Sequence, residues 1–290
     1  MKFILLGAGS IGQRHLRNLL GLGHSPAAIF DPDPRTLETI RDIALGSALT
    51  TDESTIFNYP ADAALICSPT TNHIRQALIA VERGLHVFIE KPLSHTLEGI
   101  DNLIEQASQR KRSVLVACNL RFLPSLKRVE RLLNEGRIGA PLAVRAHCGY
   151  YLPYWRPATN YRLGYGAKEE GGGIILDCIH EFDYLRWLIG DVTEVFCYAD
   201  KLSNLEIASE DTASIVFRFS TGAIGNLHLD YLQRTYRRSC EFIGEDGVIV
   251  WDYISQTVTL YGQKDRHSEV FQESINVEIN RCSLKRCSTL

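Results

Sequence analysis

The sequence predicts an α/β protein in two parts: a doubly wound parallel sheet, then an α+β domain built on a large, mostly antiparallel open sheet. Two observations lead to this prediction. Over the first 120 residues, short apolar runs alternate with helical patterns, which is typical of a parallel sheet with crossover helices. After residue 120, alternating strands follow one another through turn signals. We therefore expect one domain at 1–120 and a second at 121–290.

The first part contains five expected strands with helices between them. Each helical stretch has apolar residues three or four positions apart, which gives it one apolar face. The strands are expected at 2–6, 27–30, 63–67, 86–90 and 113–118, and the helices at 11–22, 33–44, 71–83 and 96–110.

The second part opens with a basic amphipathic helix and contains one further strong helix, which interrupts the strands. These helices are expected at 124–134 and 174–189, with a long connection at 151–173 that is rich in aromatic residues. STG at 220–222 and EDG at 245–247 predict hairpin turns. The strands are expected at 141–150, 192–201, 212–219, 223–231, 237–243, 247–252 and 256–261.

The composition excludes several classes of protein. The chain has 290 residues, of which 45% are hydrophobic and 22% charged, as in an ordinary globular protein. Its 31 Lys and Arg against 34 Asp and Glu provide no basic field for nucleic acid. The sequence contains no apolar run of membrane-spanning length and no secretory signal, so we expect a cytoplasmic protein. The eight cysteines form no CxxC pair and the histidines no cluster at metal-ligand spacing, so we expect reduced thiols and no metal.

A glycine-rich run, GAGSIG at 7–12, follows an expected strand and opens an expected helix. Glycines there allow a tight turn and let backbone N–H groups approach a pyrophosphate; the alternative is a simple glycine turn followed by a turn aspartate. Asp31 ends the next strand, where a carboxylate accepts hydrogen bonds from a ribose diol and repels a 2′-phosphate. This favours NAD over NADP, although Arg35 nearby weakens the preference. The expected cofactor-binding residues of this segment are Gly7, Gly9, Ser10, Ile11, Gly12 and Asp31.

Further polar residues follow the later strands, where open α/β sheets place their ligands. We interpret His73 as a residue lining the cofactor cleft rather than a catalyst. The residues expected to bind cofactor here are Ser68, Pro69, Thr70, His73, Glu90, Lys91 and Asn119, and Arg121 is expected to bind substrate.

Five motifs occur in a fixed order: GAGSIGQRHLRNL, CSPTTNH, EKPLS, CNLRFLP and GGGIILDCIHEFD. From residue 1 to about 270 the sequence resembles the Gfo/Idh/MocA family of NAD(P)-dependent sugar oxidoreductases. The resemblance implies a Rossmann domain and a larger open-sheet domain, with nicotinamide at their interface and a sugar-like substrate against the sheet. YWRPATNYR, followed by GGGIILDCIHEFDYLRWL, is similar to members associated with bacterial surface-polysaccharide and nonulosonic-acid pathways.

The resemblance also implies catalytic residues. The family's EKP lysine matches Lys91, and its Asp and His match Asp177 and His180, although many members separate those two by four residues rather than three. Both spacings keep two side chains on one helical face. Oxidation of an alcohol needs a group that takes the hydroxyl proton, and a histidine or a buried lysine is suitable. Lys91 and His180 can exchange the roles of base and polarising group, and Asp177 either caps the helix or orients His180.

The long connection at 151–173 carries arginines among aromatic side chains. Aromatic faces stack on sugars or bases and arginine forks pair with carboxylate or phosphate, which predicts an anionic or nucleotide-linked sugar. The alternative is a solvated loop or a subunit contact. With Arg121 and His180, the expected substrate-binding residues are Trp155, Arg156, Arg162 and Tyr165.

These features predict an oxidoreductase that transfers a hydride between NAD and a hydroxyl or keto carbon of a sugar derivative. Two alternatives are a reductase of a non-sugar carbonyl or diol and a non-catalytic NAD-binding regulator; a regulator would not require both Lys91 and His180. We expect a small-molecule substrate, no nucleic-acid or membrane partner, and a homo-oligomer, dimer or tetramer, because a large open sheet face needs covering.

The end of the chain departs from the resemblance. After about Ser274 it reads INVEINRCSLKRCSTL, which is polar, where the family continues through a helix and a strand. The protein is either naturally short or altered by a frameshift. A frameshift predicts that the genomic DNA encodes the continuing helix in another frame just past codon 280.

Overall fold

The computed structural model describes residues 1–155, 160–262 and 268–273, which form two units divided between Cys118 and Asn119. Arg156 and the chain after about residue 274, to which the substrate-binding and frameshift expectations apply, lie outside the described residues. No helix in the described part of the chain is both long and apolar enough to cross a membrane.

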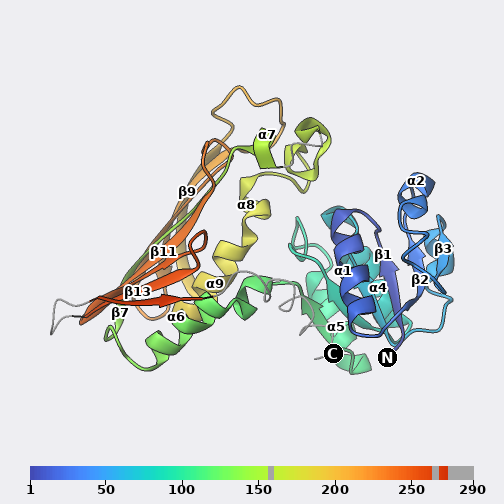
Figure 1. The fold of residues 1–290 in the computed structure, drawn as a ribbon, viewed down its shortest axis with the longest axis horizontal. Helices are drawn as coiled ribbons and strands as arrows, with labels where there is room; N and C mark the ends of the chain where they lie inside the picture. Colours follow the sequence, from blue (N-terminus) through green and yellow to red (C-terminus); the bar gives the residue numbers. More distant parts are fainter. Residues whose placement is uncertain (156–159, 263–267, 274–290) are drawn as a thin grey trace. The chain divides into compact units, whose positions relative to one another are not determined.

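The first unit is a six-stranded parallel sheet in the order β3-β2-β1-β4-β5-β6 (Figure 1). The strands are added first on one side of β1, with β2 and β3, and then on the other side, with β4 to β6. Open α/β sheets bind ligands at such a reversal of strand order, outside the carboxyl ends of the strands. The strands are β1 (Phe3–Leu6), β2 (Pro26–Phe30), β3 (Ala48–Thr50), β4 (Ala63–Ile66), β5 (His86–Ile89) and β6 (Val114–Val116).

Helices cover both faces of this sheet. In β1, Ile4 and Leu6 belong to one buried cluster, and Phe3 and Leu5 to another on the opposite face. A strand buried on both faces explains the continuous apolar run FILL. The helices are α1 (Ser10–Gly21), α2 (Pro34–Glu38), α3 (Glu53–Ile56), η1 (Thr70–Asn72), α4 (His73–Glu82) and α5 (Ile100–Arg110).

The doubly wound sheet is confirmed, with several local differences, which include the short helix α3 that was not predicted. The edge strand β3 was not predicted. The helix expected at 33–44 ends at Glu38 and continues as turns, and the helix expected at 96–110 begins at Ile100. Gly99, in the left-handed conformation with φ 76°, precedes that helix and explains its late start.

The second unit is an eight-stranded sheet in the order β14-β13-β12-β11-β7-β10-β9-β8, and the expectation of a mostly antiparallel sheet is confirmed (Figure 1). The one parallel pair among its described strands is β7 with β10. The strands are β7 (Pro141–Gly149), β8 (Val192–Asp200), β9 (Thr212–Phe219), β10 (Ile224–Asp230), β11 (Arg237–Gly244), β12 (Gly247–Asp252), β13 (Thr257–Gly262) and β14 (Ser268–Gln272). The sequence did not predict β14.

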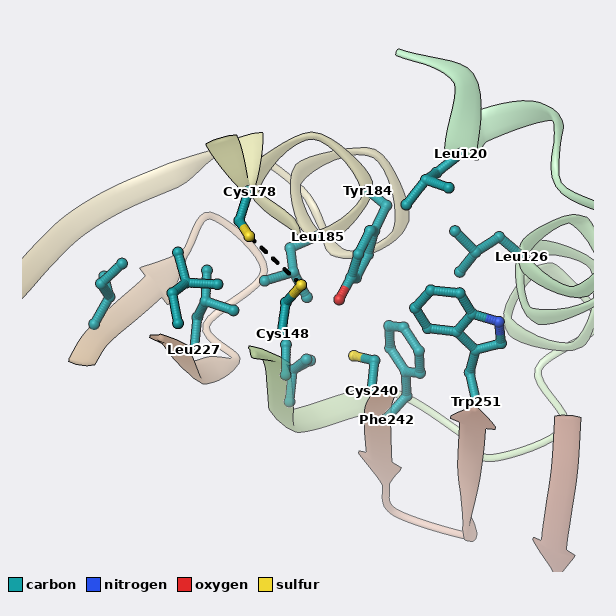
Figure 2. Packing of buried hydrophobic residues seen from close by; sticks show 14 of the residues in the cluster. Leu120, Leu126, Cys148, Cys178, Tyr184, Leu185, Leu227, Cys240, Phe242 and Trp251 are labelled. Atoms are coloured by element: carbon teal, nitrogen blue, oxygen red, sulfur yellow. Dashed lines mark hydrogen bonds between the residues drawn. The ribbon is translucent and has the colours of Figure 1, made fainter. Parts of the chain in front are cut away.

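One face of this sheet carries the core. Tyr184 and Leu185 of α9 pack on strand residues that include Cys148, Leu227 and Trp251 (Figure 2). Residues of the opposite face alternate with these along β9 and β10 and are exposed, which is the pattern of a sheet covered on one side. The remaining helices are η2 (Asn119–Phe122), α6 (Pro124–Asn134), α7 (Leu152–Trp155), η3 (Tyr161–Leu163), η4 (Tyr165–Ala167), α8 (Ile174–Asp177) and α9 (Ile179–Ile189).

The prediction of a single helix at 174–189 is wrong. The backbone of Cys178 leaves the helical conformation (φ −94°, ψ 30°), so that α8 ends at Asp177 and α9 begins at Ile179. The buried thiol of Cys178 lies at this break, with its Sγ 3.5 Å from Sγ of Cys148 (Figure 2). Asp177 and His180 therefore do not belong to one continuous helix.

Candidate active site

The glycine-rich loop joins β1 to α1, and two of its glycines are required by the fold. A Cβ at Gly7, where φ is 92°, would lie 2.7 Å from backbone atoms of Cys67 and Ser68. A Cβ at Gly12 would lie 1.9 Å from the carbonyl oxygen of Gly7. At Gly9, no atom of the described residues lies within 4 Å of such a Cβ. The space beside Gly9, at the N-terminus of α1, therefore suits the close approach of a pyrophosphate.

Asp31 follows the last residue of β2 and is buried. Its Oδ2 accepts a hydrogen bond from the backbone N–H of Ala8 (2.8 Å), and its Oδ1 accepts one from the N–H of Asp33 (3.0 Å). The carboxylate is thus held beside the glycine loop, and each oxygen keeps a further lone pair for a ribose hydroxyl. The guanidinium of Arg35 pairs with Asp33 at 3.1 Å.

His73 joins the turn after β4 to the turn after β5. Its Nε2 lies 2.9 Å from the carbonyl oxygen of Ser68, and its Nδ1 lies 2.9 Å from that of Pro92. Burial lowers the pKa of His73, although the two carbonyls favour the charged ring. Pro69 and Thr70 lie between Ser68 and α4, Thr70 as the first residue of η1. His73 therefore fixes the backbone of two segments that were expected to hold cofactor.

Glu90 and Lys91 follow β5. Oε1 of Glu90 lies 2.6 Å from Nε2 of His15, a buried residue of α1, and Oε2 accepts a hydrogen bond from the backbone N–H of Lys91 (3.0 Å). Burial alone would raise the pKa of Glu90, but the His15 and Lys91 contacts outweigh it and the pKa lies below its ordinary value. Lys91 is half-buried. Sequence analysis missed His15, which lies on the buried face of α1 with Leu16 and Leu19.

Asn119 and Arg121, expected at the cofactor and the substrate, both lie in η2 of the second unit. The guanidinium of Arg121 forms a two-pronged ion pair with the carboxylate of Asp183, with distances of 2.7 to 3.1 Å, and lies 5.9 Å from the ring centroid of Trp187. Asp183 and Trp187 are residues of α9. Arg121 is therefore a contact between η2 and α9.

Asp177 is the centre of a group of tyrosines. Its carboxylate accepts hydrogen bonds from the hydroxyls of Tyr150 and Tyr165, and from that of Tyr231 at 3.3 Å. Burial raises the pKa of Tyr150, and the charge of Asp177 adds to this, so the phenol keeps its proton and donates it. Tyr150 and Tyr231 were not predicted, because they follow two different strands, β7 and β10, and only the fold brings them to Asp177. His180, in the first turn of α9, is buried.

A cavity of about 470 Å³ opens beside Asp177 in the second unit. Trp155 and Tyr165, both expected to bind substrate, line it, and the Trp155 ring lies 4.4 Å from that of Tyr150 between centroids. Arg162, another expected residue, is exposed and forms an ion pair with Glu206. The other lining residues are Leu152, Asn160, Tyr161, Leu163, Gly164, Gly166 and Asp177.

Comparison with known families decides the classification. Residues 1–118 match the model described as "Oxidoreductase family, NAD-binding Rossmann fold", and residues 126–250 match the GFO/IDH/MocA C-terminal domain. The chain belongs to the GFO/IDH/MocA family. It is therefore an oxidoreductase of the NAD-dependent sugar and polyol group, and its first unit is an NAD-binding Rossmann domain. The open space at Gly9 and the Asp31 carboxylate fit that cofactor.

Several known proteins are similar to this chain over most of its length. Myo-inositol 2-dehydrogenase of Thermotoga maritima is 30% identical over 270 residues, which cover 90% of this chain and 78% of that protein. A levoglucosan dehydrogenase in complex with NADH has a TM-score of 0.88 at 20% identity, covering 99% of this chain and 87% of the other. The WlbA dehydrogenase of Chromobacterium violaceum, with NADH and UDP-GlcNAcA, has a TM-score of 0.80 at 24% identity, covering 98% and 81%. These two structural similarities concern the fold alone.

Proposed function

We propose that this protein is a dehydrogenase that transfers a hydride between NAD and a CH–OH or C=O carbon of an anionic or nucleotide-linked sugar. The observation that carries the proposal is the cavity beside Asp177, where a carboxylate and tyrosine hydroxyls are combined with the ring of Trp155. Sugars present hydroxyls at their edges and C–H groups on their faces, so such a lining suits them.

The anionic part of the proposal is supported by a residue that sequence analysis missed. The guanidinium of Arg234 lies 3.5 Å from the ring centroid of Tyr151, next to the segment that lines the cavity. A stacked arginine keeps its N–H donors at the ring's edge for a carboxylate or phosphate. The WlbA structure, which contains UDP-GlcNAcA, makes a nucleotide-linked sugar acid from a surface-polysaccharide pathway our first candidate.

We assign the proton chemistry to Lys91 and His180. When bound, NAD⁺ supplies the hydride acceptor. As the carbonyl forms, the hydroxyl proton passes to the ring nitrogen of His180, and the ammonium of Lys91 polarises the oxygen; the two roles can be exchanged. Asp177 accepts the tyrosine hydroxyls and so fixes their side chains beside the cavity, which makes it a positioning residue. The Glu90 carboxylate, held by His15, fixes the backbone N–H of Lys91.

The test is a substrate screen followed at 340 nm with NAD⁺. UDP-linked sugar acids, free sugar acids and neutral sugars are compared in wild type, Lys91→Ala and His180→Ala. Arg186→Ala serves as the control, because Arg186 lies on α9 but is 67% exposed and pairs with Asp191. We expect a rise with UDP-linked sugar acids in wild type and control, reduced at least a hundredfold in both variants. Full activity of both variants would contradict the assignment, and NADH binding without turnover would favour a regulator.

A neutral polyol is the second candidate substrate. The similarity to the Thermotoga myo-inositol 2-dehydrogenase, which spans 90% of this chain, favours it. Myo-inositol therefore belongs in the screen. Turnover of myo-inositol that exceeds turnover of every sugar acid would select this candidate.

We also propose a homo-oligomer, dimer or tetramer, formed through the exposed apolar side chains of β8. Phe196 and Tyr198 are 60% and 75% exposed on one face of this edge strand, with their ring centroids 5.1 Å apart, and Val195, 64% exposed, lies on the other face. An exposed apolar patch on an edge strand is a typical site of association. Sedimentation of wild type and Phe196→Glu tests this. We expect the variant to shift toward monomer, and a monomeric wild type would overturn the proposal.

A further inference from the structure

The outer face of the second sheet brings together two histidines and an aspartate. His147 of β7 lies directly opposite His228 in the neighbouring parallel strand β10, and Asp230 lies two residues further along β10. The alternating residues Cys148 and Leu227 point into the core. The three polar side chains therefore share the face that the helices do not cover, with exposures of 30% for His147, 47% for His228 and 8% for Asp230.

The distances within this group match a metal site better than a set of hydrogen bonds. Nε2 of His147 lies 3.5 Å from Oδ2 of Asp230, and Nε2 of His228 lies 3.3 Å from the same oxygen. Ordinary N–H···O bonds measure about 2.9 to 3.0 Å. A tetrahedral zinc ion with its N and O ligands about 2.05 Å away separates neighbouring ligands by about 3.4 Å. These two N···O distances are close to the spacing in a zinc site, and one ligand atom from each of the three residues lies within 4.8 Å of the others.

Surrounding contacts direct these atoms toward a common point. Oδ1 of Asp230 accepts the backbone N–H groups of Leu232 (2.9 Å) and Gln233 (2.7 Å), so Oδ2 is the oxygen that faces the histidines. Nδ1 of His228 lies 3.0 Å from the hydroxyl of Ser214, the residue opposite it on β9. When Nδ1–H donates to Ser214, the lone pair of Nε2 is available to a metal, as in second-sphere contacts of zinc sites.

A glycine makes room for the carboxylate. Gly149 of β7 lies opposite Asp230 in the register, and a Cβ there would lie 2.6 Å from Oδ2. A side chain at position 149 would therefore collide with this carboxylate oxygen. The position of Oδ2 therefore depends on both strands of the parallel pair.

We propose that His147, His228 and Asp230 bind a divalent transition-metal ion, with Zn²⁺ as the first candidate. Two imidazoles and one carboxylate are a ligand set that zinc accepts, and water would complete the tetrahedron. The site lies outside the residues proposed for hydride transfer and does not depend on that function. It also departs from our expectation of no metal, because the two histidines are 81 residues apart and only strand pairing brings them together.

The experiment titrates the metal-stripped full chain with Zn²⁺ in competition with a chromophoric chelator. His228→Gln and Asp230→Asn remove a ligand each, and Ser214→Ala removes the second-sphere hydroxyl. Two controls match them: Asn226→Ala changes the same face of β10, and His24→Gln removes a histidine from the first unit. We expect one tight Zn²⁺ per chain in wild type and controls, with affinity at least a hundredfold lower in the ligand variants and about tenfold lower in Ser214→Ala.

Separate measurements check the fold of the variants and identify which side chains bind the metal. Asp230 also accepts two backbone N–H groups, so its replacement can disturb the turn after β10, whereas His228→Gln leaves those bonds intact and is the deciding variant. Circular dichroism of the metal-free proteins checks the fold. Co²⁺ bound at the proposed site gives d–d absorption without thiolate charge transfer. Thiolate charge transfer, equal affinity in wild type and His228→Gln, or no stoichiometric binding would each overturn the proposal.

Discussion

The carboxylate of Glu181 lies 2.7 Å from the guanidinium Nε of Arg238, and the two side chains are 0% and 11% exposed. This ion pair joins α9 to β11, and Glu181 directly follows His180. Burial by itself would lower the pKa of Arg238, but the charge of Glu181 outweighs it and the pKa is raised. The pair therefore fixes the first turn of α9 against the sheet.

Breaking this pair should destabilise the second unit. Glu181→Gln leaves the Arg238 cation buried without its counter-charge, and we expect the free energy of unfolding to fall by about 3–5 kcal/mol. Glu181→Leu combined with Arg238→Met removes both charges and should recover most of the loss. All three tryptophans lie in the second unit, so fluorescence during urea unfolding reports on it alone. A double variant at least as unstable as Glu181→Gln would contradict the explanation.

Two glycines of the nucleotide loop should respond differently to alanine. Gly12→Ala places a methyl group against the Gly7 carbonyl and should lower stability by about 1–3 kcal/mol while weakening NADH binding. Gly9→Ala meets no described protein atom, and its φ of −63° suits alanine, so stability should change by less than about 0.5 kcal/mol. We expect its NADH affinity to fall at least tenfold. Circular dichroism and NADH fluorescence measure the two quantities, and wild-type affinity in Gly9→Ala would exclude a pyrophosphate at this position.

His73 should make stability depend on pH. Burial lowers its pKa in the folded protein, so the unfolded chain binds the proton first as pH falls. The contribution of His73 is thus complete above the unfolded pKa of about 6.5 and is lost as pH falls toward the folded value. In His73→Gln, the slope of unfolding free energy against pH between about 6.5 and 5 should be smaller by up to about 1.4 kcal/mol per unit. Parallel profiles from denaturation followed by circular dichroism would count against this role.

Loss of the Asp177 carboxylate should weaken the binding of substrate but not the binding of cofactor. Asp177→Asn keeps the volume but removes the charge that the hydroxyls of Tyr150 and Tyr165 face. We expect about a tenfold higher KM, which corresponds to about 1.4 kcal/mol of substrate binding, because the amide holds the two tyrosines less firmly beside the cavity; NADH affinity should be unchanged. Tyr165→Phe removes one of these hydroxyls and should raise KM as well, and Tyr261→Phe, on the exposed part of β13, is its matched control. An unchanged KM in Asp177→Asn would remove Asp177 from the substrate site.

Much of the fold follows from local pattern. The continuous apolar strands predict the parallel sheet, and the alternating ones predict the sheet with one covered face. β3 escaped prediction because its three residues, Ala48–Thr50, are half-buried at an edge and carry little periodicity. The break at Cys178 escaped because the apolar spacing continues through it.

The candidate site was predictable only where its parts are close in sequence. GAGSIG and Asp31 are recognisable from spacing alone. The contact of His15 with Glu90 joins residues 75 positions apart, and the contact of Tyr231 with Asp177 joins residues 54 apart. Such pairs are set by strand order and register, which no local pattern specifies.

The break at Cys178 places Asp177 and His180 on two different helices. A single continuous helix would hold the two residues in a fixed relation to each other. Asp177 lines the cavity, most of whose other lining residues come from the segment 152–166, whereas His180 lies in the first turn of α9, which the Glu181–Arg238 pair fixes to β11. Mutations in the segment 152–166 can change the shape of the cavity without moving His180. The same framework can thus change the substrate that the cavity accepts during evolution and keep His180, our proposed proton acceptor, in place.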